Sequence, residues 1–385
     1  MSTPSSSGSL RSASSAASKP SPEPGTDTRA PIQGLTPEDV VAQIDCDLTT
    51  ARKICAGVHQ RGDDELGLRM PKMARRKSVD AMAARFRVGR LSIVAREASA
   101  LDPFVKYVLA CEDGAQIEAV RIPLEKPGRF VVCVSSQVGC AIGCKFCATG
   151  RMGLQRNLEA WEIVEQVRVV RRDLPAGGRV HGVVFQGMGE PLANVERVMA
   201  AIRVLHHPCG SSIDQRAITV CTVGVPSAIR KLAASGLRVR LGLSITAARP
   251  AVRRSLVPVE ASNPLTEVLD AAAEYVAVTG DAPMFAVTPL AGVNTSDEDV
   301  DAFGAMVQAF RAKTGVSPRV SIVPYNAIGS DSSGGDDPFV RAGDEESKRF
   351  RDRLSVLGVP VVLRYSGGSD VGAACGQLVA KASAS

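Results

Sequence analysis

Beyond residue 104, the chain alternates short apolar runs rich in β-branched residues with longer stretches of helical periodicity. We expect strands at 104–110, 115–124, 130–136, 180–186, 217–223, 237–245, 283–290, 319–325 and 359–365. We expect helices at 159–173, 194–207, 226–235, 264–279, 297–314 and 344–357. This alternation favours an α/β fold with a mostly parallel sheet, either doubly wound or a partial (β/α) barrel. In both architectures the chemistry lies on loops that follow the carboxyl ends of strands.

The composition divides the chain into three parts. Residues 1–34 are rich in Ser, Ala, Pro and Gly with almost no bulky apolar side chain, so we expect a disordered tail. From residue 35 to 100 the pattern becomes helical, with Thr36 as a cap signal ahead of Pro37. We therefore expect a small helical domain at 35–100 and a catalytic domain at 101–385.

The second half of the helical region is basic. Its basic side chains are Arg69, Lys72, Arg75, Arg76, Lys77, Arg85, Arg87, Arg90 and Arg96. The whole chain carries a formal net charge of only +6, so any affinity for nucleic acid depends on how charge is distributed. On charge alone, a solvated helix face is favoured over a phosphate-binding surface.

The ten cysteines are too few and too unevenly spaced for the disulfide framework of a small secreted protein. They indicate reduced thiols in the cytoplasm. No segment approaches the roughly 18 consecutive apolar residues that span a bilayer, and the N-terminus lacks the apolar core of a signal peptide. We expect a cytoplasmic protein without a membrane partner.

Three of the cysteines, Cys140, Cys144 and Cys147, follow the strand expected at 130–136. Their small neighbours let the thiols converge on one inorganic centre. A structural zinc ion would need a fourth ligand, and no nearby Cys or His completes the set. Three thiolates on a [4Fe-4S] cluster leave one iron open, where the amino and carboxylate groups of S-adenosylmethionine (SAM) can bind. The C-x3-C-x2-C spacing, with Phe146 before the third cysteine, resembles the signature of the radical SAM superfamily.

Longer motifs narrow the resemblance. The segments CVSSQVGCAIGCKFCATGRMGLQRNL (133–158), QGMGEPLAN (186–194) and DVGAACGQL (370–378) resemble the radical SAM methyltransferases that modify C2 of adenine in 23S ribosomal RNA, and their C8-modifying relatives. The similarity extends from about residue 100 to 380. It implies a partial (β/α) barrel behind a helical RNA-binding domain, which favours an RNA-binding role for the basic region. It also implies tRNA as a further substrate of some members and a flavodoxin-type electron donor.

The resemblance assigns roles to two further thiols. Cys375 would accept a methyl group from one SAM, and a radical derived from a second SAM would activate that methyl group for addition to adenine. Cys133 would then close a disulfide on Cys375 and release the base. Without the flanking motifs, each thiol would be interpreted as a small buried hydrophobic residue.

Further positions match family residues that contact SAM or substrate. Gly189 and Glu190 follow the strand expected at 180–186, where a glycine turn admits a ligand and a carboxylate can accept from an ammonium group. The other expected SAM contacts are Cys221, Ser244, Thr246 and Asn326. Glu118 aligns with a carboxylate assigned as an acid or base near the substrate. Each could instead be an ordinary polar residue of a loop or a strand.

Four positions depart from the family pattern. Cys221 stands in place of a Ser, Thr246 of a His, Thr295 of an Asp and Ala327 of a Pro. These changes leave the radical chemistry intact but put the RNA target and the methylated carbon in question.

Two other functions fit the same motifs. A radical SAM enzyme acting on a peptide or small molecule would not need Cys133 and Cys375 as a redox pair. A non-catalytic iron-sulfur protein could bind RNA through the basic region and use the cluster only for stability.

Overall fold

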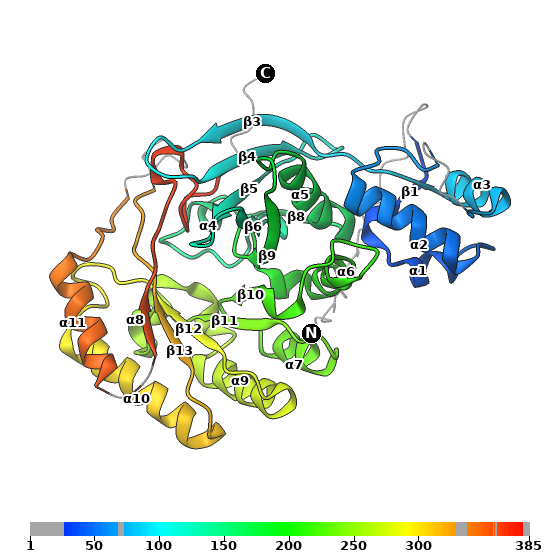
Figure 1. Cartoon of the computed structure of the whole chain (residues 1–385). Coiled ribbons are helices and arrows are strands. Elements are labelled where there is room, and N and C mark those ends of the chain that lie inside the picture. Colours follow the sequence, from blue (N-terminus) through cyan, green and yellow to red (C-terminus); the bar gives the residue numbers. More distant parts are fainter. Residues whose placement is uncertain (1–26, 68–72, 329–336, 357, 359, 380–385) are drawn as a thin grey trace, which may run out of the picture.

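The computed structural model describes residues 27–67, 73–328, 337–356, 358 and 360–379 (Figure 1). Residues 1–26 of the expected tail therefore lie outside the described residues. The strands are β1 (Ala30–Pro31), β2 (Phe86–Arg87), β3 (Ser92–Ala98), β4 (Val105–Ala110), β5 (Gln116–Pro123), β6 (Arg129–Val134), β7 (Gln137–Gly139), β8 (Leu154–Asn157), β9 (Arg179–Phe185), β10 (Ile218–Thr222), β11 (Arg240–Ser244), β12 (Met284–Val287), β13 (Arg319–Ile322) and β14 (Val361–Leu363). The helices are α1 (Pro37–Val41), α2 (Leu48–Ala56), α3 (Arg76–Arg85), α4 (Ala148–Arg151), α5 (Ala160–Arg172), α6 (Val195–His206), α7 (Pro226–Ala234), α8 (Pro250–Leu256), α9 (Leu265–Thr279), α10 (Asp297–Thr314) and α11 (Asp344–Ser355).

One large mixed sheet organises the chain. Its strand order is β14-β13-β12-β11-β10-β9-β6-β5-β4-β3. Strands β3 to β6 form an antiparallel meander, and β6, β9 and β10 to β14 run parallel to one another. Every strand and helix predicted beyond residue 104 is present within a few residues of its expected bounds. The fold is therefore the predicted partial (β/α) barrel, extended by antiparallel strands.

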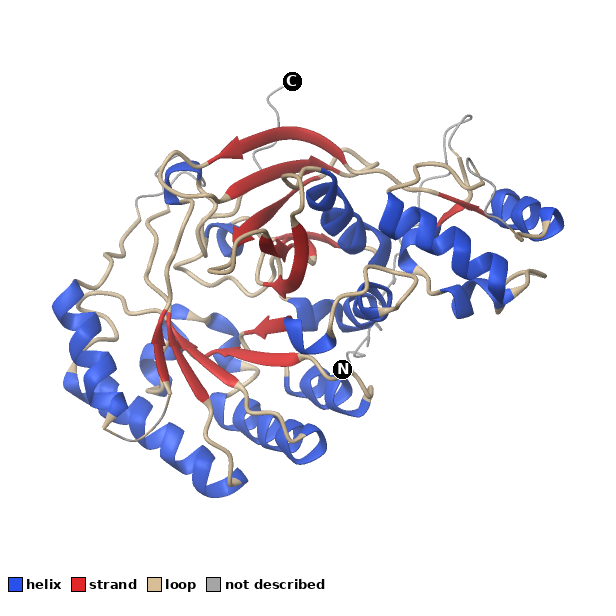
Figure 2. Ribbon diagram, in the orientation of Figure 1, coloured by secondary structure: helices blue, strands red, loops and turns tan. Residues whose placement is uncertain are grey.

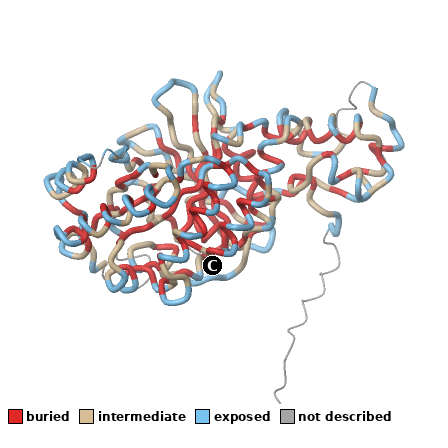
Figure 3. The backbone as a smooth tube through the Cα atoms, turned by 90° about the horizontal axis from the view of Figure 1, so that it is seen from below, coloured by how far each residue is buried: buried red, intermediate tan, exposed pale blue. Residues whose placement is uncertain are grey.

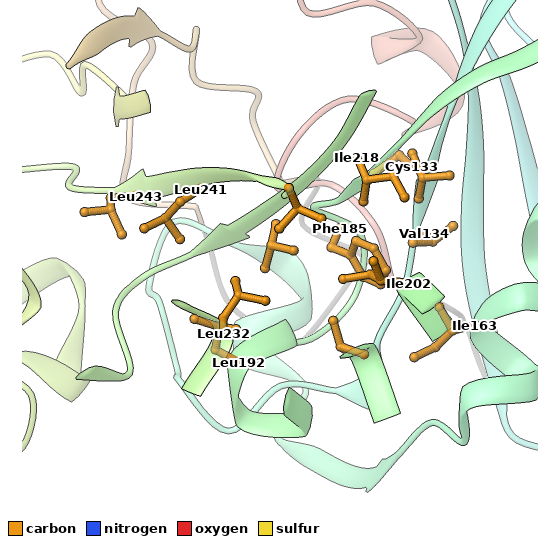
Figure 4. Close-up of a cluster of buried hydrophobic side chains, with 14 of the residues drawn as sticks. Cys133, Val134, Ile163, Phe185, Leu192, Ile202, Ile218, Leu232, Leu241 and Leu243 are labelled. Atoms are coloured by element: carbon orange, nitrogen blue, oxygen red, sulfur yellow. The ribbon is translucent and has the colours of Figure 1, made fainter. Parts of the chain in front are cut away.

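Helices cover the outer face of the curved sheet (Figure 2). The parallel strands are apolar along most of their length because both of their faces are buried. Figure 4 shows part of the core that results, with Phe185 of β9, Ile202 of α6 and Leu241 of β11 among its side chains. Each of these three side chains is at most 1% exposed. The outer helices thus cover the apolar face of the sheet, and the ends of the strands position the loops described below.

The two edge strands, β3 and β14, do not pair in the described part of the chain. The gap between them is spanned by the C-terminal segment, which we define as residues 364–379. The amide of Gly368 donates to Asp102 Oδ2 at 2.9 Å, and Ser99 Oγ donates to Asp370 Oδ1 at 2.7 Å. Asp102 and Ser99 lie between β3 and β4, so this loop and the C-terminal segment together close the barrel on its open side.

Helices α1 to α3 form a small unit beside the barrel, with their own buried residues (Figure 3). Its core contains Val40, Ile54 and Met82. Two arginines of α5 attach it to the barrel: Arg168, which is buried, donates from Nε to Val58 O at 2.9 Å, and Arg171, which is partly buried, donates from Nη1 to His59 O at 2.8 Å. No helix in the described residues is long and apolar enough to cross a membrane.

The structure corrects both ends of the expected helical domain. Residues 30–34, expected to belong to the tail, form β1 and the 3-10 helix η1 (Ile32–Gly34), in which Ile32 is fully buried. Residues 92–98, expected to be helical, form β3 and join the catalytic sheet. Most of β3 is exposed, so its sequence lacks the alternation that marks a half-buried strand.

Candidate active site

A cavity of about 150 Å³ lies at the carboxyl ends of the parallel strands, and we call it the carboxyl-end cavity. Strands β6 and β9 to β13 contribute lining residues either from their carboxyl-terminal ends or from the loops that follow them. The lining residues include Cys140, Cys144, Cys147, Gly187, Gly189, Glu190, Cys221, Thr222, Ser244, Thr246, Thr288, Tyr325 and Cys375. Nine of these were predicted from the sequence as cluster, SAM or methyl-carrying residues.

The loop that carries the three cysteines, residues 140–147, packs tightly, and we call it the cysteine loop. A Cβ atom on Gly150 would lie 2.7 Å from Cys144 O, so only glycine fits beside the loop. Burial raises the pKa of Cys140 to about 12, so these thiols need a bound metal to ionise at neutral pH. No group of three or more His, Cys, Asp or Glu side chains in the described residues is arranged around a single metal ion. A four-iron cluster does not require that geometry, because each thiolate binds a different iron atom. The three thiols around one cavity therefore fit a cluster better than a single ion.

The turn after β9 is locked against the segment that leads into the cysteine loop. Gly189 has φ +98°, and a Cβ atom there would lie 2.5 Å from Cβ of Gln137. The amide of Glu190 donates to Gln137 Oε1 at 2.8 Å, and the amide of Met188 donates to Ser135 Oγ at 2.9 Å. The glycine therefore brings the turn into direct contact with β7, the strand that leads into the cysteine loop.

The carboxylate of Glu190 lies at the centre of this arrangement. It accepts from the amide of Leu192 at 2.9 Å and from the amide of Val223, after β10, at 3.0 Å. Burial raises its pKa, and these donors oppose the shift. Because each oxygen can accept more than one hydrogen bond, the carboxylate can still bind an ammonium group in the cavity.

Cys221, Ser244 and Thr246 line the carboxyl-end cavity, as expected from the sequence. Thr246 adopts φ +62°, and its carbonyl accepts from Asn294 Nδ2 at 2.8 Å. Cys221 Sγ lies 3.7 Å from Gln186 Oε1. The two substituted family positions at 221 and 246 therefore both face the cavity.

Asn326 does not line the carboxyl-end cavity. Its amide donates to Cys375 O at 3.1 Å and to Ser366 Oγ at 2.8 Å. Its contact is therefore with the backbone that carries Cys375, which differs from the SAM contact expected from the sequence.

The backbone around Cys375 is also fixed to the cysteine loop. The amide of Ala148 donates to Gly376 O at 2.8 Å, and Thr149 Oγ1 donates to Leu378 O at 2.5 Å. Burial raises the pKa of Cys375 to about 11. Its thiol is thus held next to the residues expected to bind the cluster.

A second cavity, of about 440 Å³, occupies the barrel interior, and we call it the central cavity. Cys133 on β6 lines it, and burial raises the pKa of this thiol. Cys375, Cys221 and Gln186 line both the central and the carboxyl-end cavity. Cys133 and Cys375 therefore line the same central cavity. Cys375 lies between this cavity and the carboxyl-end cavity.

Glu118 lines neither cavity. It is 2% exposed, and Oε2 accepts from the amide of Val379 at 2.8 Å. Nζ of Lys106 lies 3.5 Å from Oε1. Burial raises the pKa of Glu118, and the charge of Lys106 opposes the shift. Glu118 was expected to lie next to the substrate, but in the structure its carboxylate contacts the C-terminal segment.

Among the cavity-lining residues that were not predicted from the sequence are Gln186 and Arg364. Gln186 directly follows β9, so the carboxyl-end rule could have identified it. Arg364 is the one charged residue of the apolar run 359–365.

Comparisons with known proteins agree with this arrangement. The model of the radical SAM superfamily matches residues 134–303. A protein of Sorangium cellulosum named a probable RNA methyltransferase is 54% identical over 360 residues, covering 89% of this chain and 91% of its own length. A protein of Picosynechococcus named a probable dual-specificity RNA methyltransferase RlmN is 42% identical over 291 residues, covering 76% and 79%. The crystal structure of a radical SAM methyltransferase from Sphaerobacter thermophilus superposes with a TM-score of 0.80 at 32% identity, covering 91% of this chain and 100% of that one.

Proposed function

Because this chain belongs to the radical SAM superfamily and, within it, to the family of RNA methyltransferases that includes RlmN, we propose that it methylates C2 of an adenine in 23S ribosomal RNA and in tRNA. The observation that carries the proposal is the position of Cys375. This thiol lines the cavity of the three loop cysteines and also the cavity of Cys133. A methyl carrier that must meet both a SAM molecule and a base needs access to two such spaces.

Cys140, Cys144 and Cys147 would hold the [4Fe-4S] cluster, with Glu190 accepting a hydrogen bond from the amino group of SAM. When bound, these groups supply an electron and a carbon radical that removes a hydrogen atom from a methyl group. The residues of the chain position the groups that take part in this reaction. The glycine turn fixes Glu190 beside the cysteine loop, and Asn326 fixes the backbone of Cys375. We further propose a flavodoxin-type electron donor and a cytoplasmic location.

The two thiols would act in sequence. The thiolate of Cys375 accepts a methyl group from the sulfonium of SAM, which leaves as the neutral thioether. After the carbon has become attached to adenine, the thiolate of Cys133 attacks the sulfur of Cys375. The C–S bond breaks, its electron pair stays on the carbon and takes up a proton, and a disulfide forms. An external reductant restores both thiols.

This order of events predicts a trapped intermediate. Cys133→Ala, purified from cells that contain the RNA substrate, should carry RNA attached through Cys375, visible as a nuclease-sensitive upward shift on a denaturing gel. The matched control, Cys133→Ala with Cys375→Ala, should show no shift. A Cys133→Ala enzyme with its cluster intact but without attached RNA would exclude this mechanism.

Two measurements separate the alternatives. Ala at any one of Cys140, Cys144 and Cys147 should remove the brown absorbance of the cluster and all reductive SAM cleavage. An intact cluster that cleaves no SAM would favour a non-catalytic RNA-binding protein. Mass spectrometry of ribosomal RNA and tRNA, with and without the gene, should show loss of methyladenosine. If no RNA lost methyladenosine while SAM cleavage persisted, a non-RNA substrate would be the better account.

A further inference from the structure

A third cavity, of about 420 Å³, lies at the amino ends of the same parallel strands, and we call it the arginine cavity. Its charged lining residues are Arg216, Arg238, Arg240, Arg319, Arg364 and Asp281. Arg240 and Arg319 are the first residues of β11 and β13, and Arg216 precedes β10. The topology of the barrel thus gathers Arg216, Arg240 and Arg319 at the end opposite to the cysteine loop, and Arg364, which follows β14, also lines the cavity.

These arginines are poorly neutralised. The carboxylate of Asp281 pairs with Arg238 at 3.3 Å, and Arg364 Nε donates to Ser321 Oγ at 2.9 Å. The other three side chains, of Arg216, Arg240 and Arg319, have no ion pair and no hydrogen bond with another described residue. Guanidinium groups gathered in a concave site around one carboxylate, itself already paired, form a binding site for an anion.

The arginine cavity adjoins the central cavity. Thr219, Arg240, Met284, Ser321 and Arg364 line both. Cys375 lines the central cavity. A molecule with its anionic group among the arginines can therefore extend an uncharged ring along the barrel interior toward the methyl-carrying thiol.

The rim of the central cavity carries an exposed aromatic ring. Tyr365 is 73% exposed and lines this cavity, and its hydroxyl donates to Asp102 at 2.9 Å. Its ring is supported by an edge-to-face contact with Phe104, with 6.2 Å between centroids. Fixed, exposed aromatic rings next to arginines are the typical surface on which proteins stack unpaired bases.

We propose that the arginine cavity binds an RNA phosphodiester adjacent to the target adenine, so that the flipped base enters the central cavity from the amino ends of the strands. The inference rests on the proposed function. Enzymes that modify a base usually extrude it into a pocket, and they hold the flanking backbone through contacts with phosphate. Arginine suits that contact because its planar fork matches two phosphate oxygens.

The test uses the full-length holoenzyme and Arg240→Gln with Arg319→Gln. Its probe is a synthetic RNA hairpin that carries the mapped target adenine in its loop. The double variant should bind this RNA about tenfold more weakly and lower the slope of log Kd against log salt by about 1. The matched control, Arg254→Gln with Arg311→Gln, removes two exposed arginines of α8 and α10 that do not line the arginine cavity and should leave both quantities unchanged. Arg240→Lys with Arg319→Lys keeps the charge and should restore the salt slope but not the full affinity.

A second arm identifies the phosphate. Hairpins with one neutral methylphosphonate at successive positions around the adenine should each be compared on the wild type and the Gln double variant. At one position, the methylphosphonate should lower the RNA affinity of the wild type about tenfold and that of the double variant less than about twofold. The double variant already lacks the arginines that contact this phosphate, so removing the phosphate charge has little further effect. Equal losses in both enzymes at every position would overturn the proposal. So would inhibition by inorganic phosphate without any methylphosphonate effect, because the cavity would then bind a free anion.

Failure of this site is distinguishable from failure of the proposed function. Reductive SAM cleavage without RNA reports on the carboxyl-end cavity, and methyl transfer to RNA by the wild type reports on the proposed function. A wild type that methylates RNA but shows no change on removal of the arginines would overturn only the arginine cavity. A wild type that cleaves SAM and methylates no RNA would overturn both.

Discussion

The carboxylate of Glu118 accepts a hydrogen bond from the backbone amide of Val379, with 2.8 Å between oxygen and nitrogen. The two residues are far apart in sequence, and the bond ties β5 to the end of the C-terminal segment. A Gln side chain can still accept that bond but cannot donate or take up a proton at neutral pH. Glu118→Gln should therefore keep most of its methyl transfer to RNA, whereas Glu118→Ala should lose about tenfold or more, as expected for the loss of a buried hydrogen bond to a charged group.

The readout for Glu118 should include the methyl content of Cys375 by mass spectrometry. A positioning role lowers methylation of Cys375 and of RNA together in the Ala variant. If Glu118→Gln lost as much RNA methylation as Glu118→Ala while Cys375 was still methylated, Glu118 would act as the acid or base that the family resemblance implies.

Cys221 offers a second thiol to the sulfur of Cys375, because both residues line the central cavity and the carboxyl-end cavity. We expect the RNA adduct of Cys133→Ala to decay slowly as Cys221 attacks in place of Cys133. Burial raises the pKa of Cys221, as it also raises that of Cys133, so little of either thiol is thiolate at neutral pH. Cys133→Ala with Cys221→Ser should hold the adduct at least about tenfold longer in a time course on denaturing gels. Equal adduct lifetimes would show that Cys221 does not reach Cys375.

The basic surface of the helical unit is less positive than its sequence indicates. Arg76 pairs with Asp80 at 2.9 Å and Lys77 with Asp45 at 2.8 Å, whereas Arg75 has no ion pair with a described residue. Arg69 and Lys72 lie outside the described residues. Replacing Arg75, Arg76 and Lys77 with Ala should weaken RNA binding and lower its salt slope, with Arg75→Ala alone giving the largest single share. If the salt slope of the triple variant matched that of the wild type in a binding titration, these residues would form only a solvated face.

His59 makes the stability of the folded chain sensitive to acid. It lies in the π-helical turn η2 (Gly57–Arg61), fully buried, and neither ring nitrogen has a hydrogen-bond partner in the described structure. Burial lowers its pKa from 6.5 to about 3. Below pH 6.5, His59 therefore binds a proton in the unfolded chain but stays neutral in the folded chain. The free energy of unfolding consequently falls as the pH decreases from 6.5 toward 3. Between pH 7.5 and 5.5 the loss is about 1.4 kcal/mol.

His59→Leu should remove this dependence. In paired thermal denaturation scans at pH 7.5 and 5.5, the variant should lose less Tm than the wild type on acidification. A variant with the same acid-induced shift as the wild type would assign the pH dependence to other groups.

The architecture and most of the site could be predicted from local sequence. Strands such as β9 and β10 are buried on both faces, so their apolar runs are unambiguous, and the carboxyl-end rule then places Glu190 at the edge where the family resemblance places Cys221. The strand β3 was missed because its exposed Ile93 and Val94 break the expected alternation.

The remaining differences depend on contacts between distant segments. Asn326 donates to the carbonyl of Cys375, and Glu118 accepts from Val379, across separations that no local pattern encodes. The arginine cavity was missed for the same reason. Its members begin different strands, and only the curvature of the sheet brings Arg240 and Arg319 together.

The C-terminal segment both closes the open side of the barrel and carries Cys375. During translation, the cysteine loop and Cys133 therefore leave the ribosome long before the thiol that would accept the methyl group. A growing or prematurely ended chain could collect its cluster and still be unable to start RNA chemistry, because the gap beside β3 would be open and the carrier absent. The proposed RNA chemistry therefore depends on the C-terminal segment twice, for the wall beside β3 and for Cys375.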